Sequence, residues 1–407
     1  MAYKEHQLVP SDGGVAERPR FICDVQDVIE EILPRLPVKS LLRFRCVCKS
    51  WRALISASLF AKKHLGHAAV TSRLQIFEFG SGEYEPGSNV ANLKVASRQL
   101  DVPRWCSADV HSVSLAQAST RTICIVGSCN GLICLQVSRG LFLLWNPCTR
   151  ETKMLPQRDT PRGGWTFYGF GYDSAGEDYK VIVGALYERY IHSVKKGSWR
   201  KLEGLDEPVH FQIEGNIGCL FNGALHWLGF KEVEGTYSVE IISFDLAEEE
   251  FQAVLPLPTR FPKTYRSWSS DGLGIGTGTS KTGLFVYHYD HTKAFTIWTK
   301  EDEYEAKKCW TKVLKIPFEI FMRYDRIVSG DYRVSYITIL ENGAVLICWD
   351  CKKVVLYRPE REIYTTVFDS ETQKLGKPGA RAGYIMAIMC LETLVSPKSC
   401  FSSSPSV

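Results

Sequence analysis

Residues 130–135 read NGLICL, an Asn-Gly dipeptide followed at once by an apolar run. The same arrangement recurs at residues 222–227 (NGALHW) and 342–347 (NGAVLI). Asn and Gly both tolerate a positive φ, so the pair favours a type I′ turn that joins two antiparallel strands. The three copies therefore predict β-hairpins that are repeated along most of the chain.

The sequence around these turns indicates a repeated four-stranded unit. Alternating runs such as RLQIFEF (73–79) and LFLLW (141–145) indicate strands, and SWRKL (198–202) resembles CWTKV (309–313). Strand-and-turn units recur every roughly 45 to 60 residues, which is the length of a propeller blade. About six such units fit between residues 71 and 395. This spacing predicts a β-propeller, with a pair of β-sandwiches as the alternative.

The sequence before residue 66 has a different period. Apolar residues fall at helical spacing from Val25 onward, and Pro37 ends one helix because it lacks an N–H. Proline can also occupy the first position of the next helix. We therefore expect about three short helices within residues 21–66, and an α+β protein of two domains with the β domain at 71–395. Residues 1–20 are expected to be a flexible lead-in, and 396–407 a disordered tail.

Basic and apolar residues are interleaved in this helical region. Residues 37–51 read PVKSLLRFRCVCKSW, and residues 35–63 contain no Asp or Glu. A nucleic-acid-binding helix would place its charges on one face with little apolar surface there. Three short helices cannot bury this much apolar surface among themselves. We expect the surplus to meet another protein or the β domain, and we expect neither a nucleic-acid nor a membrane partner.

Bulk composition is consistent with a folded protein of the cytoplasm or nucleus. The first residues, MAYKEHQLVPSDGG, contain no apolar core of a secretory signal, and no apolar run reaches the ~18 residues of a membrane span. Fourteen cysteines occur without any Asn-x-Ser/Thr sequon, which favours reduced and mostly buried thiols. The net charge of +4 does not call for a polyanionic partner.

Three short motifs could suggest enzyme chemistry. His288 and His291 lie where a strand is expected to enter a turn, so their side chains are not expected to converge on a metal. Cys348 and Cys351 form a C-x-x-C in a β region without a second pair at zinc spacing. The glycines of residues 272–278 lack phosphate-loop spacing and favour a crowded inner strand. We expect no metal, no cofactor and no catalytic residue.

The helical region resembles an F-box, the adaptor motif of SCF-type ubiquitin ligases. The resemblance lies in Asp27, in EIL (31–33), in LPVKSLLRF (36–44) and in VCKSW (47–51). Asp24 and Val25 stand where the family usually has Leu-Pro. The resemblance implies docking to an acidic Skp-type adaptor and, through it, to a cullin. The residues that it implies as contacts are Ile32, Leu33, Pro37, Leu41, Leu42, Val47, Cys48 and Trp51.

The rest of the chain resembles the plant F-box-associated domain. The matching stretches are SCNGLICL (128–135) with LWNPCTRE (144–151), YGFGYD (168–173) with DYKV (178–181), and NGALHW (222–227). This resemblance implies a kelch-like propeller whose loops capture a target protein for ubiquitination. Aromatic residues in the least regular segments are the candidate target contacts, namely Trp165, Tyr187, Tyr190 and Trp268. A glycan-binding adaptor and, less favoured, a propeller enzyme remain alternatives, and the target is not identified.

Overall fold

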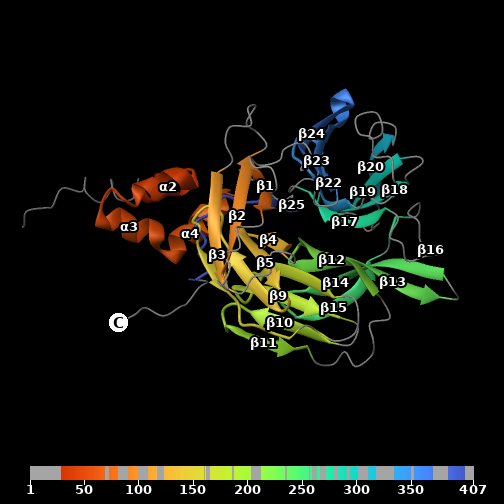
Figure 1. The fold of residues 1–407 in the computed structure, drawn as a ribbon, viewed down its shortest axis with the longest axis horizontal. Helices are drawn as coiled ribbons and strands as arrows, with labels where there is room; N and C mark the ends of the chain where they lie inside the picture. The colour runs from red at the N-terminus through yellow and green to blue at the C-terminus, as the bar shows by residue number, and fades with distance from the viewer. Residues whose placement is uncertain are drawn as a thin grey trace, which may run out of the picture.

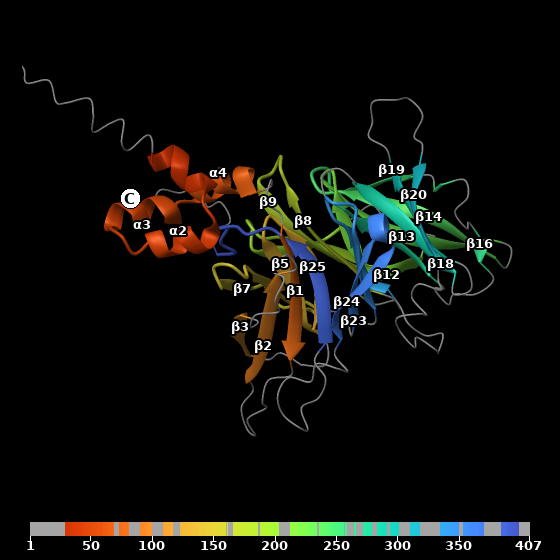
Figure 2. The ribbon, with the colours of Figure 1, turned by 90° about the horizontal axis from the view of Figure 1, so that it is seen from above.

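A short helical unit precedes a β domain. The computed structural model describes residues 29–68, 73–80, 90–99, 109–116, 123–159, 161, 166–185, 188–202, 212–233, 236–255, 257–258, 264–265, 272–278, 283–290, 294–300, 310–317, 334–349, 353–369 and 384–398. Figure 1 shows the helices at one side of the strands, and the turned view in Figure 2 shows the same separation. The predicted order of helices followed by an all-β region is confirmed.

Proline and cysteine set the boundaries of the helices. Residues 29–32 are helical and lead into the 3₁₀ turn η1 (Leu33–Arg35). Pro37 is the N-cap residue of α2 (Val38–Phe44), as its missing N–H and fixed φ favour. Cys48 caps α3 (Lys49–Ser56), because its Sγ accepts a hydrogen bond from the Trp51 N–H at 3.4 Å. The last helix is α4 (Ser58–Ala68).

The described strands form six groups of four, with one short extra strand, β16 (Thr264–Tyr265), paired to β14. The first two groups are β25 (Tyr384–Cys390), β1 (Arg73–Gly80), β2 (Val90–Gln99), β3 (Asp109–Ala116); and β4 (Cys124–Cys129), β5 (Leu132–Ser138), β6 (Leu141–Trp145), β7 (Thr152–Met154). The next two are β8 (Phe167–Asp173), β9 (Asp178–Gly184), β10 (Arg189–Ser193), β11 (Ser198–Lys201); and β12 (Gln212–Phe221), β13 (Ala224–Val233), β14 (Thr236–Asp245), β15 (Glu250–Leu255). The last two are β17 (Leu273–Thr277), β18 (Leu284–Asp290), β19 (Ala294–Lys300), β20 (Trp310–Pro317); and β21 (Val334–Ile339), β22 (Val345–Trp349), β23 (Lys353–Arg358), β24 (Ile363–Asp369), with the 3₁₀ turn η3 (Pro359–Arg361) between β23 and β24.

The ring is closed by the last strand of the chain. β25 pairs antiparallel with β1, from Arg73 opposite Cys390 to Phe79 opposite Tyr384. The inner strands β25, β4, β8, β12, β17 and β21 contact one another in that order, and β21 contacts β25 again. A closed ring of antiparallel four-stranded sheets is a β-propeller, because a pair of sandwiches would leave two separate stacks. The predicted propeller is confirmed, and within the described residues it has six blades.

Two of the three Asn-Gly turns have the predicted geometry. Asn130 and Gly131 have φ of 52° and 79°, and Asn222 and Gly223 have φ of 47° and 76°, so both pairs are left-handed as a type I′ turn requires. The prediction is wrong at the third copy. Only Gly343 has a positive φ there, at 76°. The loop from β21 to β22 is longer, and the Asn342 Oδ1 accepts a hydrogen bond from the Ala344 N–H at 3.1 Å.

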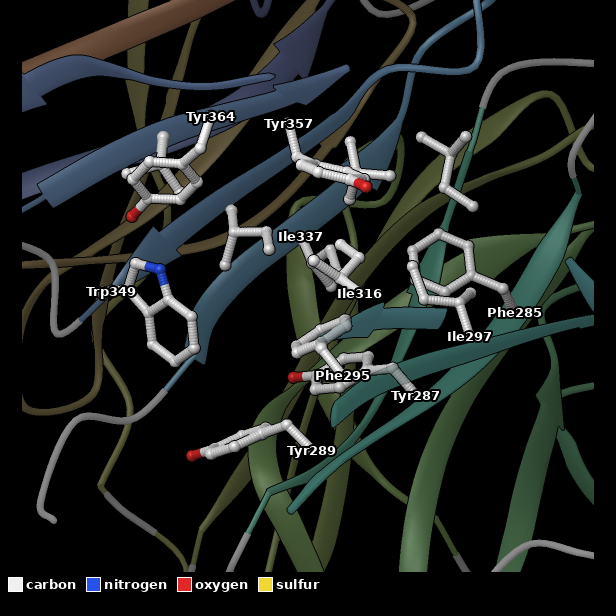
Figure 3. Packing of buried hydrophobic residues seen from close by; sticks show 14 residues of the cluster. Phe285, Tyr287, Tyr289, Phe295, Ile297, Ile316, Ile337, Trp349, Tyr357 and Tyr364 are labelled. Carbon is white, nitrogen blue, oxygen red and sulfur yellow. The ribbon is translucent and has the colours of Figure 1, made fainter. Parts of the chain in front are cut away.

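Aromatic side chains fill the space between adjacent blades. Figure 3 shows the contact between the β17–β20 blade and the β21–β24 blade. The rings of Tyr287 and Tyr289 stack on Phe295, with centroids 5.3 and 5.9 Å apart, and Tyr289 meets Trp349 edge-on at 5.6 Å. Aromatic rings bury large apolar areas and add ring–ring contacts, so they suit a wedge-shaped gap between sheets. Many aromatic side chains in the described part of the chain therefore lie in the propeller core.

The inner strands run in one direction, so their ends share one face. β8 and β12 pair in parallel at Tyr168 and Ile217, and near the ends of β21 and β17 the Thr338 hydroxyl donates to the Thr277 carbonyl at 2.9 Å. The helical unit docks at this face. It contacts the segment after β25, the β6–β7 turn and, through Lys62 and Glu177, the β8–β9 turn. Because strands alternate in direction, the fourth strand of each blade ends, and the next inner strand begins, on the opposite face.

Candidate functional site

The helical unit leaves large apolar side chains exposed. Ile32, Val47 and Leu59 are 52%, 62% and 80% exposed, although the unit has its own core and packs on the propeller. Pro37 and Cys48, at the starts of α2 and α3, are also exposed. Four of the predicted contacts, Ile32, Pro37, Val47 and Cys48, thus lie on the surface. Together with Leu59, they are here named the helical apolar surface.

The other predicted contacts lie below this surface. Leu33 and Leu41 are buried in the helical core, where they pack with Val38, Ile55 and Phe60. Leu42 and Trp51 are half-buried, and the Trp51 ring meets Phe44 edge-on at 5.5 Å. Leu33 and Leu41 therefore support the helices that carry the exposed residues. Partner contact by any of the eight stays a prediction.

The helical unit also exposes cations. Arg43, Lys49 and Arg52 are exposed on α2 and α3, and they are here named the basic rim. The acidic Glu31 of the same unit is engaged by Lys63 at 2.5 Å and by Arg35 at 3.7 Å. The hydrogen bond and charge of Lys63 lower the pKa of Glu31 below its usual value. The helical unit therefore exposes apolar side chains together with the basic rim, which suits an acidic protein partner.

Leu59 is a surface residue that the sequence reasoning missed. It lies on α4 beside the buried Phe60, and His64 is buried one turn after Phe60. Residues at i and i+4 share a helix face, so Leu59 is out of phase with the buried pair. That phase was visible in the sequence and could have identified it. Burial lowers the pKa of His64, while its Nε2 lies 3.1 Å from the Leu36 carbonyl oxygen.

One of the four predicted target contacts lies in the described part of the chain. Tyr190 is buried at the start of β10, and the Arg158 guanidinium lies over its ring at 2.9 Å from the centroid. A partner could reach that ring only if Arg158 moved away. Trp165, Tyr187 and Trp268 lie outside the described residues. Binding of a target by any of the four stays a prediction.

Within the described residues no three His, Cys, Asp or Glu side chains are placed to hold a metal ion. His288 lies in β18 and Cys348 in β22, whereas His291 and Cys351 lie outside the described residues. The nine cysteines that the structure describes are free thiols, and burial raises the pKa of Cys129 and Cys219 to about 12. Such thiols are poor nucleophiles at neutral pH.

The glycines of residues 272–278 form an inner strand, as expected. β17 spans Leu273–Thr277, and a Cβ added at Gly274 would overlap the ring of Tyr287 on β18. The glycines thus leave room for aromatic packing. None of the helices in the described residues is long and apolar enough to cross a membrane.

Comparison with protein families identifies both regions. The F-box domain family matches residues 26–63, and the family described as "F-box associated beta propeller domain" matches residues 88–384. An F-box/kelch-repeat protein of Arabidopsis thaliana is 31% identical over 82% of this chain and 89% of its own length. The F-box protein CPR1 of Arabidopsis thaliana is 29% identical over 71% of this chain and 72% of its own length.

Proposed function

The chain belongs to the F-box proteins that carry an F-box associated β-propeller domain, and we propose that it is the target-recognition subunit of an SCF-type ubiquitin ligase. In this role the helical unit docks a Skp-type adaptor, and through it a cullin. The propeller holds a target protein for ubiquitination. The chain itself supplies proximity and orientation and no catalytic group.

The observation that carries this proposal is the helical apolar surface. Ile32, Val47 and Leu59 stay exposed after the helices have formed their core and packed on the propeller. Large apolar side chains that stay exposed beside charged ones are typical of protein interaction sites. The F-box match at residues 26–63 covers all three of these residues. An adaptor is therefore the partner that this surface fits best.

The arrangement of the propeller supports target capture away from the adaptor. The helices occupy the face on which the inner strands end, so the face with the connections between blades is left for a target. Connecting segments tolerate variation on a rigid scaffold, which suits selection among targets. A role for Trp165, Tyr187, Tyr190 or Trp268 in that selection is part of the proposal. Location of the protein in the cytoplasm or nucleus is also part of the proposal.

Co-expression with a plant Skp adaptor, followed by size-exclusion chromatography, tests the proposal. The test variant is Ile32→Asp with Val47→Asp, because both side chains are exposed and neither supports the core. The matched control is Val313→Asp, an equally apolar and half-exposed position on β20. We expect a stable complex with the wild-type chain and the control but not with the double variant. A folded wild-type chain that does not bind the adaptor contradicts the proposal.

A further inference from the structure

The segment after β25 contacts both the helical unit and the propeller. Leu394 packs in the helical core, in the cluster that contains Leu41 and Phe60. Its neighbour Val395 packs in a propeller core cluster, with Leu155 among its members. Both side chains are buried. Consecutive residues of one extended segment therefore insert into opposite cores.

A buried asparagine fixes the backbone of this segment. Asn146, at the end of β6, donates its Nδ2 to the Thr393 carbonyl at 3.0 Å and to the Val395 carbonyl at 2.7 Å. Its Oδ1 accepts from the N–H groups of Cys148 and Thr149 at 2.8 and 3.2 Å. The amide thus uses both of its donors and its acceptor inside the protein, which locks its rotamer. The asparagine holds the segment from the β6–β7 turn.

The β4–β5 hairpin holds the segment from its other side. The Thr393 hydroxyl donates to the Asn130 carbonyl at 2.9 Å. Gly131 has φ of 79°, and a Cβ there would collide with the Thr393 side chain and the Leu391 carbonyl. The Asn-Gly turn therefore forms a hairpin and also makes room for this segment.

The helices and the propeller also touch directly, because Leu65 of α4 packs against the propeller cluster that contains Val395. The exposed Lys62–Glu177 ion pair is of a kind that contributes little in water. A small, partly open pocket of about 60 Å³ is lined by residues of α3, α4, the β6–β7 turn and this segment. Cys148 of the β6–β7 turn packs against the helical core. Among these contacts in the described residues, the segment is the one that buries a side chain in each core.

We propose that residues 391–396 act as a strut that fixes the orientation of the helical unit on the propeller. The strut couples the two units because Leu394 and Val395 place one buried anchor in each. The effect of the strut on ubiquitin transfer rests on the function proposed above. A fixed orientation presents a bound target at a constant distance from the adaptor, which limits the lysines that can be modified.

Amide hydrogen exchange of the full chain, read by mass spectrometry, tests the strut. We expect Leu394→Ala to raise exchange in α2, α3 and α4 by at least about tenfold, because it opens a cavity in the helical core. Exchange in β4–β6 should stay unchanged. The matched control is the adjacent Val395→Ala, which should raise exchange in β4–β6 instead. The proposal is contradicted if the two variants show the same pattern of amide exchange. It is also contradicted if the helices of Leu394→Ala exchange as slowly as those of the wild type.

A milder variant separates orientation from folding. Thr393→Val keeps both buried anchors and removes the hydrogen bond to Asn130. We expect it to retain adaptor binding but to spread self-ubiquitination over more propeller lysines in a reconstituted ligase. An unchanged lysine pattern overturns the orienting role. If the wild-type chain does not bind the adaptor, the proposed function fails, whereas the exchange experiment still decides whether the strut couples the two units.

Discussion

Lys180 Nζ lies 2.8 Å from Asp173 Oδ2, with side chains that are 7% and 4% exposed. The same ammonium lies 2.8 Å from Glu249 Oε1 and donates to the Leu246 carbonyl at 2.5 Å. Asp173 ends β8, whereas Leu246 and Glu249 lie in the β14–β15 turn. The lysine therefore ties two neighbouring blades together.

Replacing Lys180 by Met should destabilise the propeller by about 3 kcal/mol, because removal of one partner leaves Asp173 buried without its cation, whereas Glu249 keeps its ion pair with Arg200. Chemical denaturation followed by tryptophan fluorescence measures the change. The control is Lys201→Met at an exposed position of β11, which should change stability by less than about 0.5 kcal/mol. Equal effects of the two variants would contradict the buried network.

His192 should make the propeller sensitive to acid. Burial lowers its pKa to about 4, whereas the unfolded chain titrates near 6.5. Between these values the unfolded state binds more protons, so stability falls as pH decreases from about 6.5 to about 4. His192→Phe keeps a ring against Trp199, which meets it at 4.9 Å, and removes the titration.

Melting temperatures from pH 7.5 to 4.5 test this prediction. The His192→Phe variant should lose less stability over that range than the wild type. His226, whose pKa burial also lowers to about 4, and His64, whose pKa burial lowers, remain in both proteins and contribute to the remaining acid dependence. Parallel pH curves for the variant and the wild type would show that His192 is not the source.

Gly274→Ala should destabilise the chain by about 1 to 3 kcal/mol, because the added methyl group overlaps the Tyr287 ring and the packed core cannot yield easily. Gly66→Ala on α4 provides the opposite case. No atom lies within 4 Å of a Cβ built there, and the exchange of Gly for Ala favours a helix by up to about 1 kcal/mol. Thermal unfolding of both variants should show changes of opposite sign.

The basic rim should act on the rate of association with the adaptor. Arg43→Glu with Lys49→Glu reverses two exposed charges without touching the core, and it should slow association most at low salt. Stopped-flow or surface-based kinetics at several ionic strengths would measure this. The control is Lys312→Glu with Lys315→Glu on β20. An association rate that does not depend on salt in the wild type would exclude steering by the rim.

Local residue chemistry predicted much of the fold. Pro37 divides the helices because proline lacks an N–H, and the Asn-Gly pairs at 130 and 222 form left-handed turns because both residues tolerate positive φ. The prediction failed at Asn342, where the loop length set by β21 and β22 overrode the dipeptide preference. Some of the predicted adaptor contacts are exposed and others are buried, because helical spacing alone does not distinguish an outward face from an inward one when both are apolar.

The sequence by itself determined the order of the units, the hairpins at Asn130 and Asn222 and the helix break at Pro37, because these depend on local backbone preference and on short-range pattern. It also carried the motifs by which the family is identified. Only the tertiary structure decided which apolar residues remain exposed after folding. It buried Leu41, exposed Val47 and Leu59, and brought Thr393 and Val395 to Asn146, nearly 250 positions earlier in the chain. Such contacts depend on closure of the ring by β25, and ring closure joins residues that no local sequence pattern relates.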